Sequence, residues 1–187
     1  MAPRSKKNEA QSEKVAEVKV TVIGDGAVGK SSLIRRWAQN KFQRSYLKTL
    51  GVDITDKVID VGGGQLKMVM WDIAGQEEYK QFRSAFYSGT QAVVMVADVT
   101  NPATFESLPQ WRDEVEQFVN QGLPSIFLAN KCDLVEERKV LADEVDRARK
   151  ILGLAEHQMF ETSALSGQNV DESFLRLAQL ILKINKQ

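Results

Sequence analysis

The sequence predicts an α/β fold: a three-layer, doubly wound and mainly parallel sheet of six strands, one of them antiparallel. Two observations lead to this prediction. Short apolar runs with strand patterning alternate with longer segments of helical spacing along most of the chain, which is typical of such sheets. One pair of strands is joined by the tight turn Gly62-Gly63-Gly64, and strands joined so closely must be antiparallel.

Composition sets the class of protein. The 187 residues suit one domain, and a hydrophobic share of 43% is enough for a core. Lys and Arg total 25 and Asp and Glu total 25, so the chain lacks the basic excess of a general nucleic-acid binder. The only cysteine, Cys132, excludes an internal disulfide and suits a reducing compartment, and no apolar run approaches the ~20 residues of a membrane span. We therefore expect a cytoplasmic protein with no nucleic-acid partner.

The N-terminal segment predicts an arm followed by a strand and a helix. Residues 1–16 are polar and charged and predict a disordered arm, which leaves residues 17–187 as the folded domain. Alternation from Val18 to Ile23 predicts the first strand. Helical spacing of apolar residues then predicts a helix from Lys30 to about Gln39.

The middle of the chain predicts a hairpin and two buried strands. Val52–Val61 and Leu66–Ile73 alternate on either side of the glycine turn and predict the hairpin strands. Ala92–Asp98 and Ser125–Ala129 are continuous apolar runs. Such runs are typical of strands buried on both faces of a parallel sheet.

A helix is predicted between these two buried strands. Asn101 and Pro102 suit its N-cap and first turn, and Pro109 is expected to kink or restart it because proline donates no N–H. One face of this helix is expected to be apolar, with Leu108, Trp111, Val115 and Phe118.

The last third of the chain predicts two helices and a strand. Ala142–Leu152 is amphipathic and is followed by Gly153, a typical helix C-cap, and Met159–Thr162 predicts a short final strand. Asn169, with Glu172 three residues later, resembles a capping box and opens the final helix. The inward face of that helix is expected to carry Val170, Phe174, Leu177, Ile181 and Ile184.

The stretch Gly24–Ser31, Gly-Asp-Gly-Ala-Val-Gly-Lys-Ser, fits the phosphate-loop pattern G-x-x-x-x-G-K-[ST] between a strand and a helix. Glycines 24, 26 and 29 can adopt backbone angles closed to other residues, so that successive N–H groups can surround an anion. The positive end of the next helix favours the same anion. Lys30 can reach the outer phosphates and Ser31 can ligate Mg²⁺. A glycine-rich turn before a basic helix is the alternative, which the flanking strand and helix disfavour.

Further candidates lie around the hairpin. Asp72 ends a predicted strand and can hold a water on Mg²⁺, while Gly75 allows its N–H to approach the terminal phosphate. Gln76 can orient an attacking water. The hydroxyl of Thr49 can complete the Mg²⁺ shell, although an ordinary surface threonine explains its presence equally well.

A second group of candidates points to a guanine base. Asp133 can accept two hydrogen bonds from the ring N–H and amino group of guanine, a donor pair that adenine lacks. Asn130 would brace the neighbouring loops and the stem of Lys131 would cover the face of the base. After the last strand, the small residues Ser163 and Ala164 allow a backbone N–H to meet the guanine carbonyl.

With these motifs in this order, residues 17–184 resemble a small GTPase of the Ras superfamily, above all of its Rab branch. The resemblance implies the small G domain of P-loop NTPases, slow hydrolysis of GTP to GDP, and Mg²⁺ held by Ser31, Thr49 and, through water, Asp72. It implies Phe42 as the edge-on guanine contact and Tyr46 as a neighbour of the γ-phosphate. The expected catalytic residues are Gln76, Lys30, Thr49 and Gly75. The expected nucleotide-binding residues are Asp25, Gly26, Ala27, Val28, Gly29, Lys30, Ser31, Ser32, Phe42, Tyr46, Thr49, Gly75, Asn130, Lys131, Asp133, Ser163, Ala164 and Leu165.

The resemblance also implies partners: effectors, an exchange factor and a GTPase-activating protein that act on two nucleotide-sensitive loops of a monomer, in membrane trafficking or related signalling. Ile54 and Phe86 stand where Rab proteins usually have Phe and Tyr in an apolar triad with Trp71, so the identity of the effectors does not carry over. The sequence ends without the cysteines that are prenylated in Rab proteins, so either the chain is truncated or this member is not prenylated. Any membrane association is expected to be indirect, with the protein in the cytoplasm and peripheral to membranes.

Two other functions remain to be compared with this one. A GTP-bound interaction module with negligible hydrolysis is disfavoured by Gln76 and by Gly26, which leaves room for a water and an incoming arginine. A P-loop kinase that uses ATP would bind ATP as well as GTP, which Asp133 disfavours.

Overall fold

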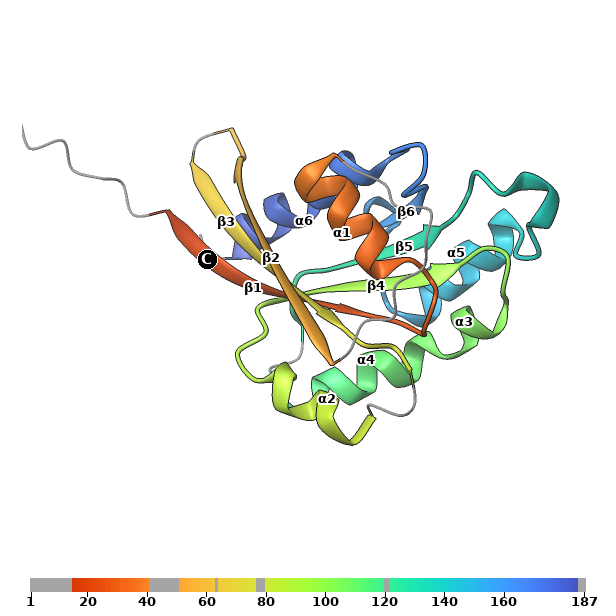
Figure 1. Cartoon of the computed structure of the whole chain (residues 1–187), viewed down its shortest axis with the longest axis horizontal. Coiled ribbons are helices and arrows are strands. Elements are labelled where there is room, and N and C mark those ends of the chain that lie inside the picture. The colour runs from red at the N-terminus through yellow and green to blue at the C-terminus, as the bar shows by residue number, and fades with distance from the viewer. Residues whose placement is uncertain (1–14, 41–50, 63, 77–79, 120–121, 185–187) are drawn as a thin grey trace, which may run out of the picture.

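The computed structural model describes residues 15–40, 51–62, 64–76, 80–119 and 122–184. Within these ranges six strands form one sheet in the order β2-β3-β1-β4-β5-β6 (Figure 1). Neighbouring strands are parallel except β2, which runs antiparallel to β3, so the predicted fold class is confirmed. The strands are β1 (Ala16–Ile23), β2 (Val52–Asp60), β3 (Gln65–Ile73), β4 (Ala92–Asp98), β5 (Ser125–Asn130) and β6 (Met159–Thr162).

Helices cover both faces of this sheet. One face carries α1 and α6, and the other carries α2, α3, α4 and α5 (Figure 1). In the ranges described, no helix combines the length and apolar character needed to cross a bilayer. The α-helices are α1 (Lys30–Gln39), α2 (Lys80–Tyr87), α3 (Ala103–Glu106), α4 (Leu108–Glu116), α5 (Ala142–Ile151) and α6 (Val170–Ile184), and the 3₁₀ helices are η2 (Val135–Glu137) and η3 (Glu156–Gln158).

Each face of the sheet has its own hydrophobic core. Beneath α1 and α6, the ring of Trp37 stacks on Phe174 with centroids 4.6 Å apart. On the opposite face, Phe105 meets Phe127 edge to face with ring centroids 5.7 Å apart, and the buried Val115 of α4 belongs to the same core. Strands such as β4, in which every residue is buried, contribute alternate side chains to the two cores.

The helix predicted between β4 and β5 is present as two helices, α3 and α4. The prediction that Pro109 restarts a helix is confirmed, because α3 ends at Glu106 and α4 begins at Leu108 with proline in its first turn. The prediction that Phe118 lies on the buried face of this helix is wrong. Phe118 follows the end of α4 and is 47% exposed, since the helix stops at Glu116.

Helix α2 is absent from the sequence expectation, and α6 begins in an unexpected way. The capping box expected at Asn169 and Glu172 is not among the hydrogen bonds of the described chain. Asn169 instead has a φ of 55°, and its side-chain amide donates to the carbonyl of Glu161 at 2.7 Å. The end of β6 is thereby tied directly to the start of α6.

The N-terminal end of the described chain leads into β1. Most of the expected arm, residues 1–16, is outside the described residues, and Ala16 already belongs to β1. Strand β1 then lies between β3 and β4.

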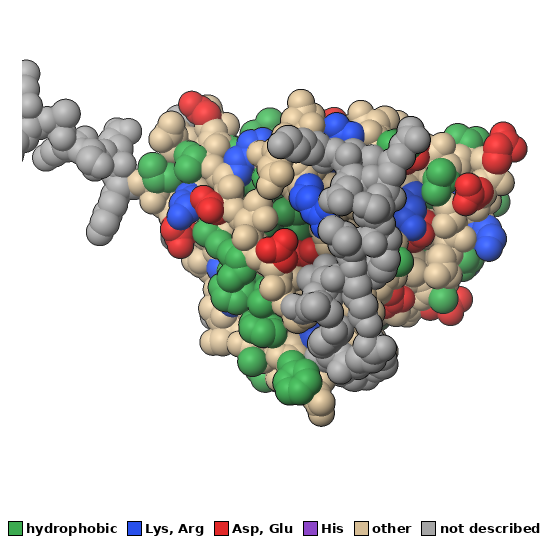
Figure 2. Space-filling model, in the orientation of Figure 1, with side chains coloured by type: hydrophobic (Ala, Val, Ile, Leu, Met, Phe, Trp, Pro, Cys, Tyr) green, Lys and Arg blue, Asp and Glu red, His purple; other side chains and the backbone are tan. Residues whose placement is uncertain are grey.

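Hydrophobic side chains reach the surface over β2, β3 and α2 (Figure 2). Ile54 and Val58 of the edge strand β2 are 51% and 46% exposed, and Phe82 of α2 is 57% exposed. Trp71 and Phe86 lie near each other with ring centroids 6.4 Å apart. The antiparallel edge of the sheet and α2 therefore carry exposed apolar side chains.

The topology gathers the motif loops at one edge of the sheet. The segments that follow β1, β3, β5 and β6 all leave the carboxyl ends of strands, and these strands are parallel to one another. The carboxyl edge of a doubly wound sheet is where ligands bind.

Candidate functional site

The loop Gly24–Ser31 joins β1 to α1 in a compact backbone arrangement. Gly24 and Gly29 have φ values of 135° and 100°. A Cβ on Gly24 would lie 2.2 Å from Val96 O, and a Cβ on Gly29 would lie 2.3 Å from Asn130 Nδ2. Both positions therefore require glycine. Gly26 was expected to be able to adopt a similar conformation, but it does not have a positive φ. The residue other than glycine with a positive φ in this loop is Ala27, at 65°.

Lys30 is buried inside this loop. Its Nζ donates hydrogen bonds to the carbonyls of Gly24 at 2.7 Å and Asp25 at 2.9 Å. Burial lowers the pKa of Lys30 to about 8, against the opposing effects of the Asp72 and Asp25 carboxylates. Ser31 and Ser32 lie in the first turn of α1, and backbone N–H groups at a helix N-terminus can bind an anion.

Ser31 and Asp72 meet at the start of α1 and the end of β3. The Ser31 hydroxyl donates to Asp72 Oδ2. The other oxygen, Oδ1, is buried and accepts no hydrogen bond from the residues described. Burial raises the pKa of the Asp72 carboxyl, while Lys30 and the Ser31 hydroxyl act in the opposite direction. A hydroxyl beside a buried carboxylate oxygen with spare acceptor capacity fits a Mg²⁺ ion and its water.

The segment after β3 lies against the phosphate loop. A Cβ on Gly75 would lie 2.3 Å from the carbonyl oxygen of Gly24, so only glycine allows this approach. A Cβ on Gly26 would lie 3.3 Å from Cγ of Gln76, which places the Gln76 side chain over the loop. The N–H of Ala74 donates to the Gly51 carbonyl at 2.9 Å and ties the segment to the start of β2.

Three expected ligand contacts, Phe42, Tyr46 and Thr49, lie outside the described residues.

The loop after β5 is braced against the phosphate loop. Asn130 is buried, and its Nδ2 donates to the Val28 carbonyl at 2.9 Å while its Oδ1 accepts from the Thr162 hydroxyl at 3.3 Å. One side chain thus connects the ends of β5 and β6 to the phosphate loop. Lys131 has a φ of 68°, and its Nζ forms a 2.5 Å ion pair with Asp98 Oδ2. Asp133 follows in the same loop and is partly buried.

The loop after β6 contains Ser163, Ala164 and Leu165, of which the first two are buried and the third is exposed. The hydroxyl of Ser163 accepts a hydrogen bond from the N–H of Ser166 at 3.0 Å. Arg36 of α1 holds this loop, since Nε donates to Ala164 O at 2.8 Å and a second guanidinium nitrogen donates to Leu165 O. Helix α1 therefore contacts the loop after β6 as well as the phosphate loop.

Sequence reasoning missed Arg36 and Asp98. An acidic residue at the end of the apolar run 92–98 is a signal that could have drawn attention to Asp98. Arg36 gives no such signal, because it lies on the polar side of α1 and its partner Ala164 is 128 positions away.

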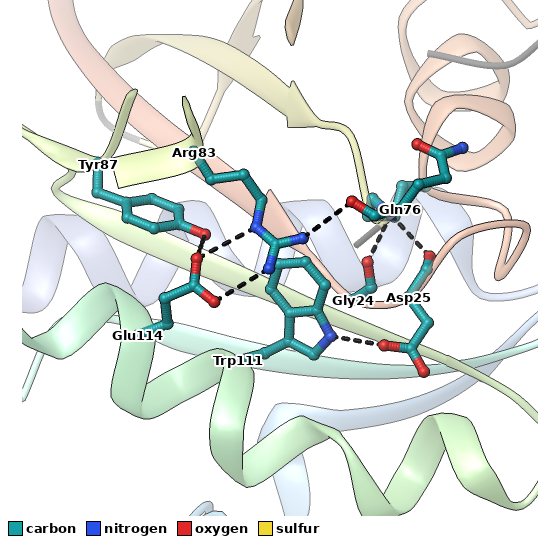
Figure 3. Close-up of polar contacts among 8 residues, drawn as sticks. Gly24, Asp25, Gln76, Arg83, Tyr87, Trp111 and Glu114 are labelled. Atoms are coloured by element: carbon teal, nitrogen blue, oxygen red, sulfur yellow. Dashed lines mark hydrogen bonds and ion pairs between the residues drawn. The ribbon is translucent and has the colours of Figure 1, made fainter. Parts of the chain in front are cut away.

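A third missed group surrounds the carboxylate of Asp25 (Figure 3). The indole Nε1 of Trp111 donates to Asp25 Oδ1 at 2.7 Å, so the Asp25 side chain is directed to α4. The guanidinium of Arg83 lies 4.1 Å from the Trp111 ring centroid and pairs with Glu114. Trp111 was expected only as a core residue, and nothing in the sequence pattern relates it to Asp25.

Comparison with known proteins agrees with this geometry. The model of the Ras family matches residues 19–183. Ras-related protein Rab-13 of Mesocricetus auratus is 37% identical over 164 residues, which cover 88% of this chain and 79% of that protein. Ras-related protein Rab-1C of Dictyostelium discoideum is 35% identical over 170 residues, or 91% of this chain and 83% of that protein.

Ras-related protein SEC4 of Saccharomyces cerevisiae is 37% identical over 164 residues, which cover 88% of this chain and 74% of that protein. The part of this chain that matches the family and the relatives thus includes the sheet and the motif loops described above. The chain therefore belongs to the Ras family and is a Rab-like small GTPase, an enzyme that hydrolyses GTP.

Proposed function

We propose that this protein is a molecular switch that alternates between GTP-bound and GDP-bound states. The observation that supports this proposal best is the position of Gln76, whose Cγ would lie 3.3 Å from a Cβ on Gly26. A glutamine above the phosphate loop is well situated to orient a water toward the terminal phosphate. A module that only binds nucleotide has no need of such an arrangement.

The nucleotide would lie along the carboxyl edge of the sheet. Its phosphates would contact the loop backbone from Asp25 to Ser32 and the amine of Lys30, which would exchange two carbonyl acceptors for phosphate oxygens. At the other end, Asp133 would accept the two N–H donors of guanine, and the backbone of Ser163, Ala164 and Leu165 would meet its carbonyl. Phe42 and Tyr46 are proposed as further nucleotide contacts, by resemblance to the family.

Mg²⁺ would be held by Ser31, by Thr49 and, through a water, by Asp72. The ion would neutralise charge on the outer phosphates. Ser31 and the buried Oδ1 of Asp72 suit this role, because one is a neutral oxygen ligand and the other has spare acceptor capacity.

In hydrolysis, the Gln76 side chain and the Thr49 carbonyl would orient the attacking water. Lys30 and the loop N–H groups would stabilise charge on the transferred group, as preorganised donors do in phosphoryl transfer. Gly75 would bring its N–H toward the γ-phosphate, which its close approach to Gly24 favours. Loss of that phosphate would release the segments around Thr49 and Gly75.

We propose that these two segments are read by effectors, an exchange factor and a GTPase-activating protein, and that the chain, as a monomer, acts in membrane trafficking or related signalling. The resemblance to the Rab branch supports the process, and the exposed apolar side chains of Ile54 and Phe82 support protein contacts near the site. We place the protein in the cytoplasm, at the periphery of membranes.

Replacement Gln76→Leu tests the catalytic proposal. In single-turnover assays of preloaded GTP, we expect an intrinsic rate of about 10⁻⁴ to 10⁻² s⁻¹ for the natural chain and at least a roughly tenfold lower rate for the variant, since the water is no longer oriented. Gln81→Leu, an exposed change on α2, is the matched control and should leave the rate unchanged. An unchanged rate in Gln76→Leu would exclude the catalytic role of this residue.

Competition between ATP and GTP for the nucleotide-free protein tests the choice of base. We expect ATP to compete at least about a thousandfold more weakly, because adenine lacks the donor pair that Asp133 would accept. Comparable binding of the two nucleotides would contradict guanine recognition.

A further inference from the structure

Arg83 of α2 is a buried charge that the proposed mechanism leaves without a role. The residue is 2% exposed. Its Nε and one terminal nitrogen donate to the two carboxylate oxygens of Glu114 on α4, at 3.1 and 3.2 Å. Glu114 is itself fixed by the Tyr87 hydroxyl, which donates to Oε1 at 2.9 Å. Burial of a charge is unfavourable unless it is paired and hydrogen-bonded, and here each partner satisfies the other.

The remaining terminal nitrogen of Arg83 is directed to the proposed catalytic segment. It donates to the main-chain carbonyl of Gln76 at 3.3 Å (Figure 3). Because the two-pronged pair with Glu114 fixes the plane of the guanidinium, the direction of this third donor is also fixed. The Arg83 side chain thereby fixes the Gln76 main chain relative to α4, a rigid element packed on the sheet.

The same guanidinium is linked to the phosphate loop. Its central carbon lies 4.1 Å from the ring centroid of Trp111, within the range of a cation–π contact. The indole N–H of Trp111 donates in turn to the carboxylate of Asp25 at 2.7 Å. Gln76 on one side and Asp25 on the other are thus connected through two side chains, Arg83 and Trp111, both almost fully buried.

We propose that Arg83 is a positioning residue for GTP hydrolysis: it holds the Gln76 main chain in register with the phosphate loop through Glu114 and Trp111. The inference rests on the proposed function, since it assumes that the Gln76 side chain orients the attacking water. A side chain that must aim a water depends on a fixed main chain, and errors of about 1 Å in such positions lower rates severely.

Two sets of variants test this role. Arg83→Lys keeps the charge but loses the rigid set of donors that serves Glu114 and Gln76 together. Because an unpaired Glu114 could impair folding, the second variant combines Arg83→Met with Glu114→Gln, which removes both charges of this pair and keeps an acceptor for Tyr87. Arg112→Lys, a partly exposed neighbour of Trp111 on α4, is the matched control.

Each variant is assayed for single-turnover hydrolysis of preloaded GTP, for release of a fluorescent GDP analogue and for thermal unfolding. We expect both Arg83 variants to hydrolyse GTP about tenfold more slowly while GDP release changes less than about threefold, because the water is misplaced and the nucleotide contacts remain. A merely structural role would change unfolding and GDP release together. Hydrolysis at the natural rate in the folded double variant would overturn the inference.

Combination with Gln76→Leu separates the two proposals. If Arg83 acts through Gln76, Arg83→Lys lowers the rate in the natural background and has no further effect in the Gln76→Leu background. Effects that multiply would overturn the positioning role and leave the role of Gln76 intact. An unchanged rate in Gln76→Leu alone would overturn both.

Discussion

Asp133 is the single residue on which the proposed choice of nucleotide depends most. Its loop is well defined, because the N–H of Cys132 donates to the Thr162 carbonyl at 3.1 Å and Lys131 is paired with Asp98. The Asp133 carboxylate extends from the residue next to Cys132 in this fixed loop. Since a carboxylate only accepts hydrogen bonds, it can match the two adjacent donors of guanine and no arrangement of adenine.

The replacement Asp133→Asn should therefore change the preferred base. An amide offers one acceptor and one donor, so we expect GTP affinity to fall at least about a hundredfold and affinity for xanthosine triphosphate to rise, because xanthine has a carbonyl in place of the guanine amino group. Competition against a fluorescent GDP analogue measures both effects. The matched change Asp143→Asn on the exposed start of α5 should alter neither, and an unchanged preference in Asp133→Asn would contradict base selection by this residue.

Among the helices, α1 serves both the phosphate loop and the loop after β6. Its first turn supplies Lys30 and Ser31, and near its other end Arg36 donates to the carbonyls of Ala164 and Leu165. The buried face of the helix, with Leu33, Ile34 and Trp37, anchors it on the sheet. The loop proposed to meet the guanine carbonyl is thus held by a helix from the opposite end of the chain.

Loss of the Arg36 contacts should accelerate release of GDP. In Arg36→Met the aliphatic stem remains, and the hydrogen bonds to the Ala164 and Leu165 carbonyls are lost together with a long one of 3.5 Å to Asn40. We expect about tenfold faster release, equivalent to ~1.4 kcal/mol. Displacement of a fluorescent GDP analogue by excess GDP measures the rate. Arg147→Met, on the exposed side of α5, provides the control, and equal release rates in the two variants would argue against the role of Arg36.

Prediction from sequence succeeded for elements with a clear apolar period and failed for α2. The strands and α1 follow from alternation or helical spacing, and Pro109 marked the restart at α4. Helix α2 spans only eight residues, so the helical spacing of Phe82, Phe86 and Tyr87 is a short signal. Phe82 is exposed, Tyr87 is the buried aromatic, and much of the attachment of α2 is the pair of Arg83 with Glu114, which lies 31 positions further along the chain.

The candidate site divides in the same way. Residues of a contiguous motif such as Gly24–Ser31 can be predicted to lie together, because they are neighbours in sequence. Separate motifs can be predicted to meet, because the strand order brings them to one edge of the sheet. Arg36, Asp98 and the cluster of Arg83 with Trp111 depend on contacts between distant segments. The end of an apolar run marks Asp98 in the sequence, but no local pattern encodes which distant residue each of these side chains contacts, so the contacts became visible only in the folded chain.

The fold as a whole depends on two cores separated by one sheet. Phe174 occupies the centre of the core under α1 and α6, is fully buried and stacks on Trp37. The core thereby joins the helix that carries Lys30 to the last helix of the chain. Damage there should reduce the stability of the domain while the chemistry at the carboxyl edge of the sheet stays intact.

The change Phe174→Ala tests this view. We expect the free energy of unfolding to fall by about 3–5 kcal/mol through lost burial and the cavity left behind. Urea denaturation at a fixed, saturating GDP concentration measures the loss, since bound nucleotide itself adds stability. Leu175→Ala, one position along and 41% exposed, should cost no more than about 0.5 kcal/mol, and similar losses in both variants would contradict the central place of Phe174.

Helix α1 also sets a length. Lys30 and Arg36 lie about 9 Å apart along its axis, at about 1.5 Å of rise per residue, and they serve the two ends of the proposed nucleotide. A guanine nucleotide is then a bivalent ligand of two sites that the helix holds at a fixed separation. When one end of the nucleotide detaches, the other end keeps it at a high effective concentration near the site it has left. Guanosine or pyrophosphate alone lacks the span to gain this advantage. An exchange factor that disturbs either end of α1 would weaken both attachments at once.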